Sequence, residues 1–179
     1  MHLVAMLNWR RPFLRAFMRL TDHTDYSLRT LIYAAVHPGE LVHVQSVADA
    51  FDIPKNHLVK IVQKLGQAGF LHTVRGRAGG IRLGQPAEAI NLGAVVRAME
   101  PDFALVECFQ SEGNACVITQ ACGLRGVLGE ALGAYFKVLD RYTLADLTTQ
   151  PATLQRLLGE AVTSSVPLAA VTVKGKSPR

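Results

Sequence analysis

Apolar residues recur at helical spacing from position 24 onward, and turn-forming residues separate the periodic stretches. A first helix is expected over residues 24–37, with Thr24 or Asp25 as its N-cap. A second helix is expected from about Ser46 to the break at Ile53-Pro54. The periodic part of the chain therefore begins with two helices joined by a short loop.

The next helix, expected over residues 55–67, has two unlike sides. Its apolar side holds Leu58, Ile61, Val62 and Leu65, and its polar side holds Asn56, His57, Lys60, Gln63, Lys64 and Gln67. Two short helices joined by a tight turn, the second with a polar and basic outer face, predict a helix-turn-helix.

Two short strand-like runs, 70–74 and 81–83, flank a turn rich in arginine and glycine. This pattern predicts a basic-tipped hairpin, which after a helix-turn-helix is typical of the wing of a winged helix. A glycine-rich loop can instead cradle a nucleotide phosphate. That alternative is disfavoured because no P-loop Lys-Ser/Thr follows the turn and no helix begins there.

The second half of the chain predicts further helices. A helix over residues 92–100 follows Asn91, and a longer one is expected over 122–142. The apolar face of the longer helix is wide, and few elements remain to cover it, so we expect a dimer helix. Packing on its own domain is the alternative. From Pro151 onward the pattern fades into a tail that we expect to be mobile. The expected fold class is mainly α with a small β-hairpin.

Charge is unevenly distributed in this chain of 179 residues and net charge +5. Residues 53–87 contain six Lys or Arg and no Asp or Glu. A solvated face would normally mix both signs, so this segment favours an anionic partner.

All three cysteines, Cys108, Cys116 and Cys122, lie within fifteen residues. The spacing is looser than the two to four residues that separate ligands in most zinc fingers. It suits an iron–sulfur cluster, whose irons prefer sulfur ligands. A zinc site, thiol redox chemistry and inert thiols remain alternatives. No histidine follows His72, so the fourth ligand of a cluster would be an oxygen donor, a distant residue or solvent. An oxygen ligand would leave one iron with an exchangeable position.

Four features together resemble the iron–sulfur winged-helix family of transcription repressors. They are "MRLTDHTDYSLRTLIYAA" (18–35), "VQSVADAFDIPKNHLVKIVQKLGQAGF" (44–70), "VRGRAGGIRLGQPAEAINLGAVVRAMEP" (74–101) and the three cysteines. The segment "TLADL" (143–147) further resembles the nitric-oxide-sensing NsrR branch. The resemblance covers about residues 18–147.

The resemblance implies a homodimeric repressor that binds double-stranded operator DNA and releases it when nitric oxide reacts with its cluster. The implied cluster ligands are Cys108, Cys116 and Cys122, with Asp25 supplied by the partner subunit. A [4Fe-4S] cluster is favoured over [2Fe-2S]. Arg29, one turn after Asp25, would hold that carboxylate. Without the family, a helix N-cap is an equally good interpretation of Asp25.

The resemblance also implies that the third helix enters the major groove while the wing reaches the minor groove. The expected DNA contacts are Lys55, Asn56, His57, Lys60 and Lys64 on the helix and Arg75, Arg77 and Arg82 on the wing.

Two details of the cysteine segment help to decide which branch of the family this chain resembles. The cluster-supply branch, IscR, has a histidine three residues after the last cysteine, where this chain has Arg125. That difference favours the nitric-oxide branch, and an IscR-like regulator of iron–sulfur supply or redox state is the alternative function. The seven residues between Cys108 and Cys116 exceed the five typical of the family, which leaves the cluster geometry open.

Neither an enzyme nor a membrane protein is expected. A thiol oxidoreductase is disfavoured because the chain has no Cys-x-x-Cys pair and no βαβ pattern. No apolar run approaches the roughly 20 residues that span a bilayer, and no export signal is complete, so we expect a cytoplasmic protein. The expected layout is a disordered extension (1–17), a winged helix-turn-helix DNA-binding domain (18–101), a cysteine loop (102–123), a dimerisation helix (124–147) and a mobile tail (148–179).

Overall fold

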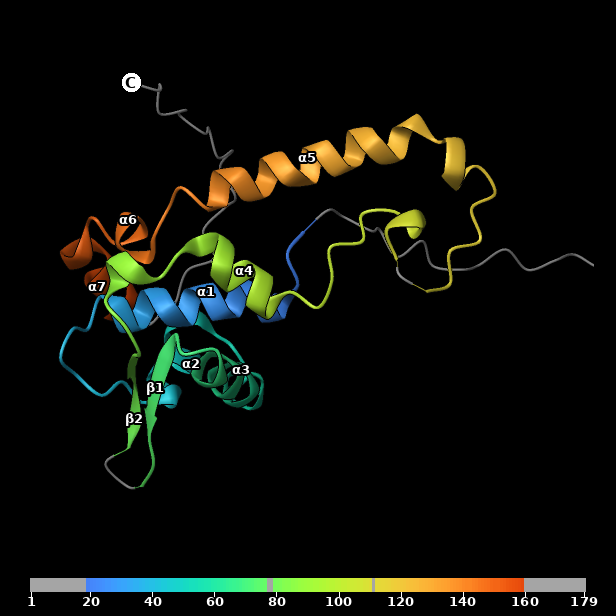
Figure 1. The fold of residues 1–179 in the computed structure, drawn as a ribbon. Helices are drawn as coiled ribbons and strands as arrows, with labels where there is room; N and C mark the ends of the chain where they lie inside the picture. The colour runs from blue at the N-terminus through green and yellow to red at the C-terminus, as the bar shows by residue number, and fades with distance from the viewer. Residues whose placement is uncertain (1–18, 77–78, 111, 160–179) are drawn as a thin grey trace, which may run out of the picture.

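The computed structural model describes residues 19–76, 79–110 and 112–159, and helix α1 (Asp22–Ala35) is central to its fold (Figure 1). Helices α2, α3, α4 and α6 and strand β2 all contact α1. The core between them is built from fully buried side chains, among them Leu31, Leu58, Leu65, Ile81 and Leu144. The expected extension 1–17 lies outside the described residues.

The N-terminus of α1 differs from the sequence expectation. Thr21, not Thr24 or Asp25, is the N-cap, and its side chain accepts a hydrogen bond from the Thr24 backbone N–H. The carboxylate of Glu100 accepts hydrogen bonds from the Thr21 backbone N–H and from the hydroxyls of Thr21 and Thr24. A hydroxyl N-cap stabilises a helix by about 1 kcal/mol. Because Thr21 provides the cap, the Asp25 side chain is free for other contacts.

The predicted helix-turn-helix is confirmed. Helix α2 (Val44–Phe51) and helix α3 (Lys55–Gln67) are joined by a turn in which Asp52 adopts a left-handed conformation with φ of 51°. Aspartate tolerates this conformation better than most residues. The buried side chain of Ile53 fixes the turn to the core. Gly69, with φ of 78°, then ends α3 and redirects the chain into the hairpin.

The predicted hairpin is also confirmed, as strands β1 (Leu71–Val74) and β2 (Gly80–Leu83). The strands pair antiparallel, with Leu71 opposite Leu83 and His72 opposite Arg82. An isolated bridge between Val42 and Ile81 adds a third backbone segment to the hairpin, which the sequence did not indicate. Ile81 is buried, so this bridge attaches the base of the hairpin to the core.

Helix α4 (Leu92–Met99) begins after Asn91, as predicted. The Asn91 side chain caps it by accepting a hydrogen bond from the Ala94 backbone N–H. Three short 3-10 turns also occur: η1 (Ala87–Ala89), η2 (Glu107–Phe109) and η3 (Thr119–Ala121). The last two belong to the long connection between α4 and α5 (Figure 1).

The C-terminal elements differ from the expected helix and tail. Helix α5 (Gly123–Leu139) ends earlier than expected, and a separate short helix, α6 (Leu144–Leu147), follows a turn. Leu144 is fully buried, which pulls the chain back onto the core and ends the long helix. The first part of the expected mobile tail forms helix α7 (Pro151–Gly159), and the Gln155 side chain donates a hydrogen bond to the Val36 carbonyl. Residues 160–179 lie outside the described residues.

Candidate functional site

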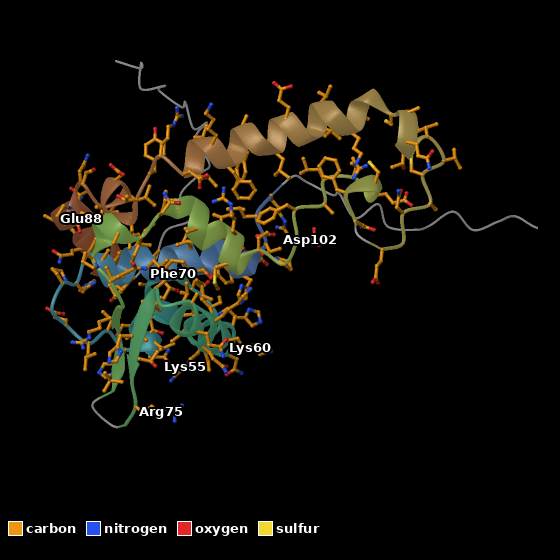
Figure 2. All side chains as sticks on the ribbon, viewed as in Figure 1. Lys55, Lys60, Phe70, Arg75, Glu88 and Asp102 are labelled. Atoms are coloured by element: carbon orange, nitrogen blue, oxygen red, sulfur yellow. The ribbon has the colours of Figure 1, made fainter. Side chains whose placement is uncertain are left out.

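The outer face of α3 is polar and exposed. Lys55, Asn56, His57 and Lys60 are all exposed, while Leu58, Ile61, Val62 and Leu65 on the other side are buried. Figure 2 shows Lys55 and Lys60 on the side of the molecule away from α5. The sequence pattern places Gln63 on this polar side without marking it as a DNA contact, and it does not include the exposed Val59. The sequence could have indicated both residues, because they follow Asn56 by three and seven positions and so lie on the same side of the helix.

Lys64 lies apart from that exposed set. Its Nζ donates a hydrogen bond to the Met99 carbonyl at 3.1 Å, near the end of α4. Burial lowers the pKa of His23, and the positive charge of Lys64 lowers it further. A hydrogen bond with the Met99 backbone and the charge of Glu100 act in the opposite direction. Lys64 therefore connects α3 to the end of α4, and a DNA contact for it stays a prediction.

The hairpin brings further basic residues to the side of the molecule where α3 is exposed. Arg75 and Arg82 are exposed, and Figure 2 shows Arg75 at the hairpin tip, on the same side as Lys55 and Lys60. Arg82 pairs with His72 across the strands on the outer face of the hairpin. Arg77, the remaining wing residue of the prediction, lies outside the described residues. Lys55 and Lys60 of α3 and Arg75 of the hairpin thus lie on one side of the molecule.

The three cysteines lie on the connection between α4 and α5, and all three are free and half-buried. Cys108 lies in η2 and Cys122 is the N-cap residue of α5. The Asn114 side chain accepts a hydrogen bond from the Cys116 backbone N–H at 3.1 Å, and the Thr119 hydroxyl donates to the Cys116 carbonyl at 2.7 Å. The backbone around Cys116 is therefore fixed locally by side-chain hydrogen bonds.

The single chain does not assemble a closed metal site. No group of three or more His, Cys, Asp or Glu side chains within the described residues is placed to hold a metal ion. The cysteine loop also exposes apolar side chains that globular proteins normally cover, with Val117 96% exposed and Ile118 60% exposed. Val117 and Ile118 therefore form an exposed apolar part of the cysteine loop.

Asp25 and Arg29 form the ion pair that the sequence suggested. Arg29 Nη2 lies 2.6 Å from Asp25 Oδ2, and both side chains are partly exposed. The Arg29 guanidinium also lies 5.9 Å from the centroid of the Phe51 ring, at the end of α2. Asp25 is thus a partly exposed carboxylate, held by an arginine that also contacts the helix-turn-helix.

Helix α5 has no buried residue, although it carries two apolar stripes. One stripe, Leu128, Leu132, Phe136 and Leu139, is half-buried. The other, which we name the α5 seam, is exposed and consists of Leu124, Val127, Ala131, Ala134 and Val138. The seam residues are alternately three and four residues apart, which is the spacing of paired helices in coiled coils.

A bidentate ion pair attaches the C-terminal end of α5 to α4. Arg97 Nη1 and Nη2 donate to the two Asp140 carboxylate oxygens at 2.6 and 2.8 Å. The guanidinium also lies 4.2 Å from the centroid of the Phe136 ring. The hydrogen bond from Arg97 lowers the pKa of Asp140. A Cβ atom on Gly93 would lie 1.9 Å from Asp140 Oδ1, so this close approach requires glycine.

Comparison with protein families and known proteins gives a consistent result. Residues 20–150 match the model of the Rrf2 family, described as an iron-dependent transcriptional regulator. The HTH-type transcriptional regulator NsrR of Bacillus subtilis is 54% identical over 142 residues, which cover 79% of this chain and 97% of that protein. The protein of the same name from Bacillus licheniformis is 50% identical and covered to 99%.

Solved structures show the same fold. CymR, the global cysteine regulator of B. subtilis, superposes with a TM-score of 0.60 at 27% identity, over 74% of this chain and 98% of that one. T. potens IscR superposes with a TM-score of 0.59 at 23% identity, over 77% and 91% of the two chains. No helix among the described residues is long and apolar enough to cross a membrane.

Proposed function

Because this chain belongs to the Rrf2 family of DNA-binding transcriptional regulators, which are not enzymes, we propose that it is a homodimeric iron–sulfur repressor that releases operator DNA in response to nitric oxide. The observation that carries this proposal is the cysteine loop. It holds three free, half-buried thiols in one connection, directly after the last helix of the winged-helix unit. Such a regulator works in the cytoplasm, where its operator is found.

The chemistry of the donor set fits an iron–sulfur cluster, even though the single chain does not assemble the site. Cys108, Cys116 and Cys122 offer three sulfur ligands, and soft thiolates suit clustered iron. A bound cluster, [4Fe-4S] in this proposal, would supply iron at which nitric oxide binds. Side chains of the same loop bond the backbone on both sides of the Cys116 thiol, through its N–H and its carbonyl.

Asp25 is the proposed fourth ligand, supplied by the partner subunit. Its carboxylate is partly exposed, is not used as a helix cap, and is oriented by Arg29 at 2.6 Å. A harder oxygen donor is the weakest ligand of such a set. A change at Asp25 would reach the DNA-binding elements through direct packing, because α1 contacts α2, α3 and β2.

The α5 seam is the proposed dimer interface. Val127 is 63% exposed and Leu124 59% exposed in the single chain, at coiled-coil spacing. Dimerisation would bury these side chains, and it would also bring a second copy close enough to supply Asp25. A symmetric dimer presents two recognition helices, and their separation must match half-sites about one turn of DNA apart.

The proposed DNA interface combines the exposed face of α3 with the hairpin. Lys55, Asn56, His57 and Lys60 would contact the major groove and its phosphates, with Arg75, Arg77 and Arg82 at the minor groove. Lys64 is the least favourable of the predicted contacts because its ammonium group is bound to the Met99 carbonyl.

Cluster content tests this function directly. Anaerobically purified protein should absorb visible light, and native mass measurement should give a dimer that carries iron and sulfide. Alanine at Cys108, Cys116 or Cys122 should abolish the absorption. Gln120→Ala, an exposed position between the last two cysteines, should retain it. Colourless wild-type protein with stoichiometric zinc contradicts the proposal.

A further inference from the structure

Val59 is an apolar side chain within the exposed polar face of α3. It is 51% exposed, a larger fraction than Leu41 (39%) or Val74 (38%), the other exposed large apolar residues described between 19 and 101. Single exposed apolar residues are common on protein surfaces. A role for Val59 is therefore inferred from its position within the proposed DNA interface and not from its exposure alone.

Two amide side chains flank Val59 on the same side of the helix. Asn56 precedes it by three residues and Gln63 follows it by four, which places the three on one stripe. Asn56 and Gln63 are exposed, and within the described ranges no hydrogen bond occupies either amide. The stripe therefore presents amide, isopropyl and amide groups in sequence towards the surrounding solvent.

This order of groups corresponds to the edges of A·T base pairs. In the major groove adenine presents N7 and N6–H₂, which an Asn or Gln side chain can bind with two hydrogen bonds, and thymine presents a 5-methyl group that favours apolar contact. A phosphate contact would use a charged or hydrogen-bonding side chain instead. Valine is also a poorer helix former than glutamine or lysine, so helix stability does not explain its presence at an exposed position.

We propose that Val59 determines sequence specificity by contacting the 5-methyl group of a thymine in the major groove, between adenine contacts from Asn56 and Gln63. This inference rests on the proposed function, because it requires α3 to enter the major groove. The ligand class it names is operator DNA with thymine at one fixed position of each half-site.

Replacement of thymine by deoxyuridine tests the contact, because it removes the methyl group and preserves base pairing. The full-length, anaerobically purified chain first selects its preferred duplex from random sequences. Each thymine of that duplex is then replaced in turn, and dissociation constants are measured. We expect about a fourfold loss of affinity at one thymine per half-site, the effect of one buried methyl group.

Two variants make the result specific. In Val59→Ala the difference between the thymine and deoxyuridine duplexes should shrink, because alanine presents less apolar surface to the methyl group, and alanine preserves the helix. Val74→Ala, an exposed valine on the hairpin, should retain the fourfold difference. Equal wild-type affinity for all duplexes, or an unchanged loss in Val59→Ala, overturns this inference and leaves sequence-specific DNA binding intact. If no sequence is enriched, the proposed function and this inference both fail.

Discussion

At the residue scale, the N-terminus of α1 shows how one side chain leaves another available for other contacts. Thr21 and Glu100 satisfy the first turn of the helix, with the Glu100 carboxylate accepting from the Thr21 backbone N–H at 3.3 Å. Arg29 then holds the Asp25 carboxylate in an ion pair, and both side chains remain partly exposed. An acid in the first turn also interacts favourably with the helix dipole, so substitutions there need a matched control.

Asp25→Ala should give a protein that still acquires a cluster but loses it about tenfold faster in air, because water replaces a positioned carboxylate. The decay of visible absorption measures this rate. Asp22→Ala removes an acid from the same helical turn, and its partner Arg19 is 3.8 Å away. The visible absorption of this control variant should decay at the rate of the wild type. Equal decay in both variants removes Asp25 from the ligand set.

The Arg97–Asp140 pair predicts a pH-dependent attachment of α5 to α4. The pKa of Asp140 is lowered in the folded protein, chiefly by the Arg97 hydrogen bond. A group with a lowered folded pKa contributes stability above its ordinary pKa, and this contribution disappears as the pH falls through the lowered value. Asp140→Asn should therefore melt at a lower temperature than the wild type at pH 7.

The same comparison at acidic pH provides the control. Once Asp140 is protonated in the wild type, the difference in melting temperature between wild type and Asp140→Asn should shrink towards zero. A difference that stays constant between pH 7 and acidic pH would show that the carboxylate charge does not stabilise this contact.

At the element scale, the sequence predicted those helices and strands whose apolar pattern and capping residues all lie within the segment itself. Helix α3 has a full apolar side and a glycine after its end, and α4 has a capping asparagine, so both were predicted within a residue. Helix α7 was missed because its stabilising contact, from Gln155 to Val36, joins residues far apart in sequence. The hydrogen bond from Lys64 to Met99 was invisible for the same reason.

Lys60 and Lys64 are a matched pair on α3 that should differ in their effect on DNA binding. Lys60 is exposed, whereas Lys64 donates to the Met99 carbonyl. Lys60→Ala should weaken binding to all sequences alike and reduce the salt slope of log affinity by about one. Lys64→Ala should leave that slope unchanged. A Lys60→Ala slope equal to that of the wild type would show that Lys60 contacts no phosphate.

The α5 seam should determine whether the protein dimerises. Val127→Glu places a charge on the seam, and desolvating that charge in an interface is unfavourable. This variant should sediment as a monomer at concentrations where the wild type is a dimer. Lys137→Glu adds the same side chain to an exposed position off the seam and should remain dimeric. A dimeric Val127→Glu variant would place the interface elsewhere.

At the scale of the whole molecule, the proposed cluster segment and the proposed DNA interface occupy different regions, and packed helices link them. In Figure 1 the hairpin and α3 lie on one side of α1, and α5 lies on the other. The cysteine connection begins just after Glu100, which also binds the start of α1. Composition and local spacing predicted both regions separately. Their connection through Glu100 and Lys64 required the three-dimensional arrangement, because it joins residues from three helices.

The most direct test measures the affinity of the anaerobic, cluster-loaded dimer for its selected duplex before and after addition of nitric oxide. We predict tight binding before addition and a loss of about 10- to 100-fold afterwards, within the usual range of coupling between two sites. Cys108→Ala protein should bind weakly under both conditions. Iron-free wild-type protein that binds the duplex as tightly as the loaded dimer, with no response to nitric oxide, contradicts the account.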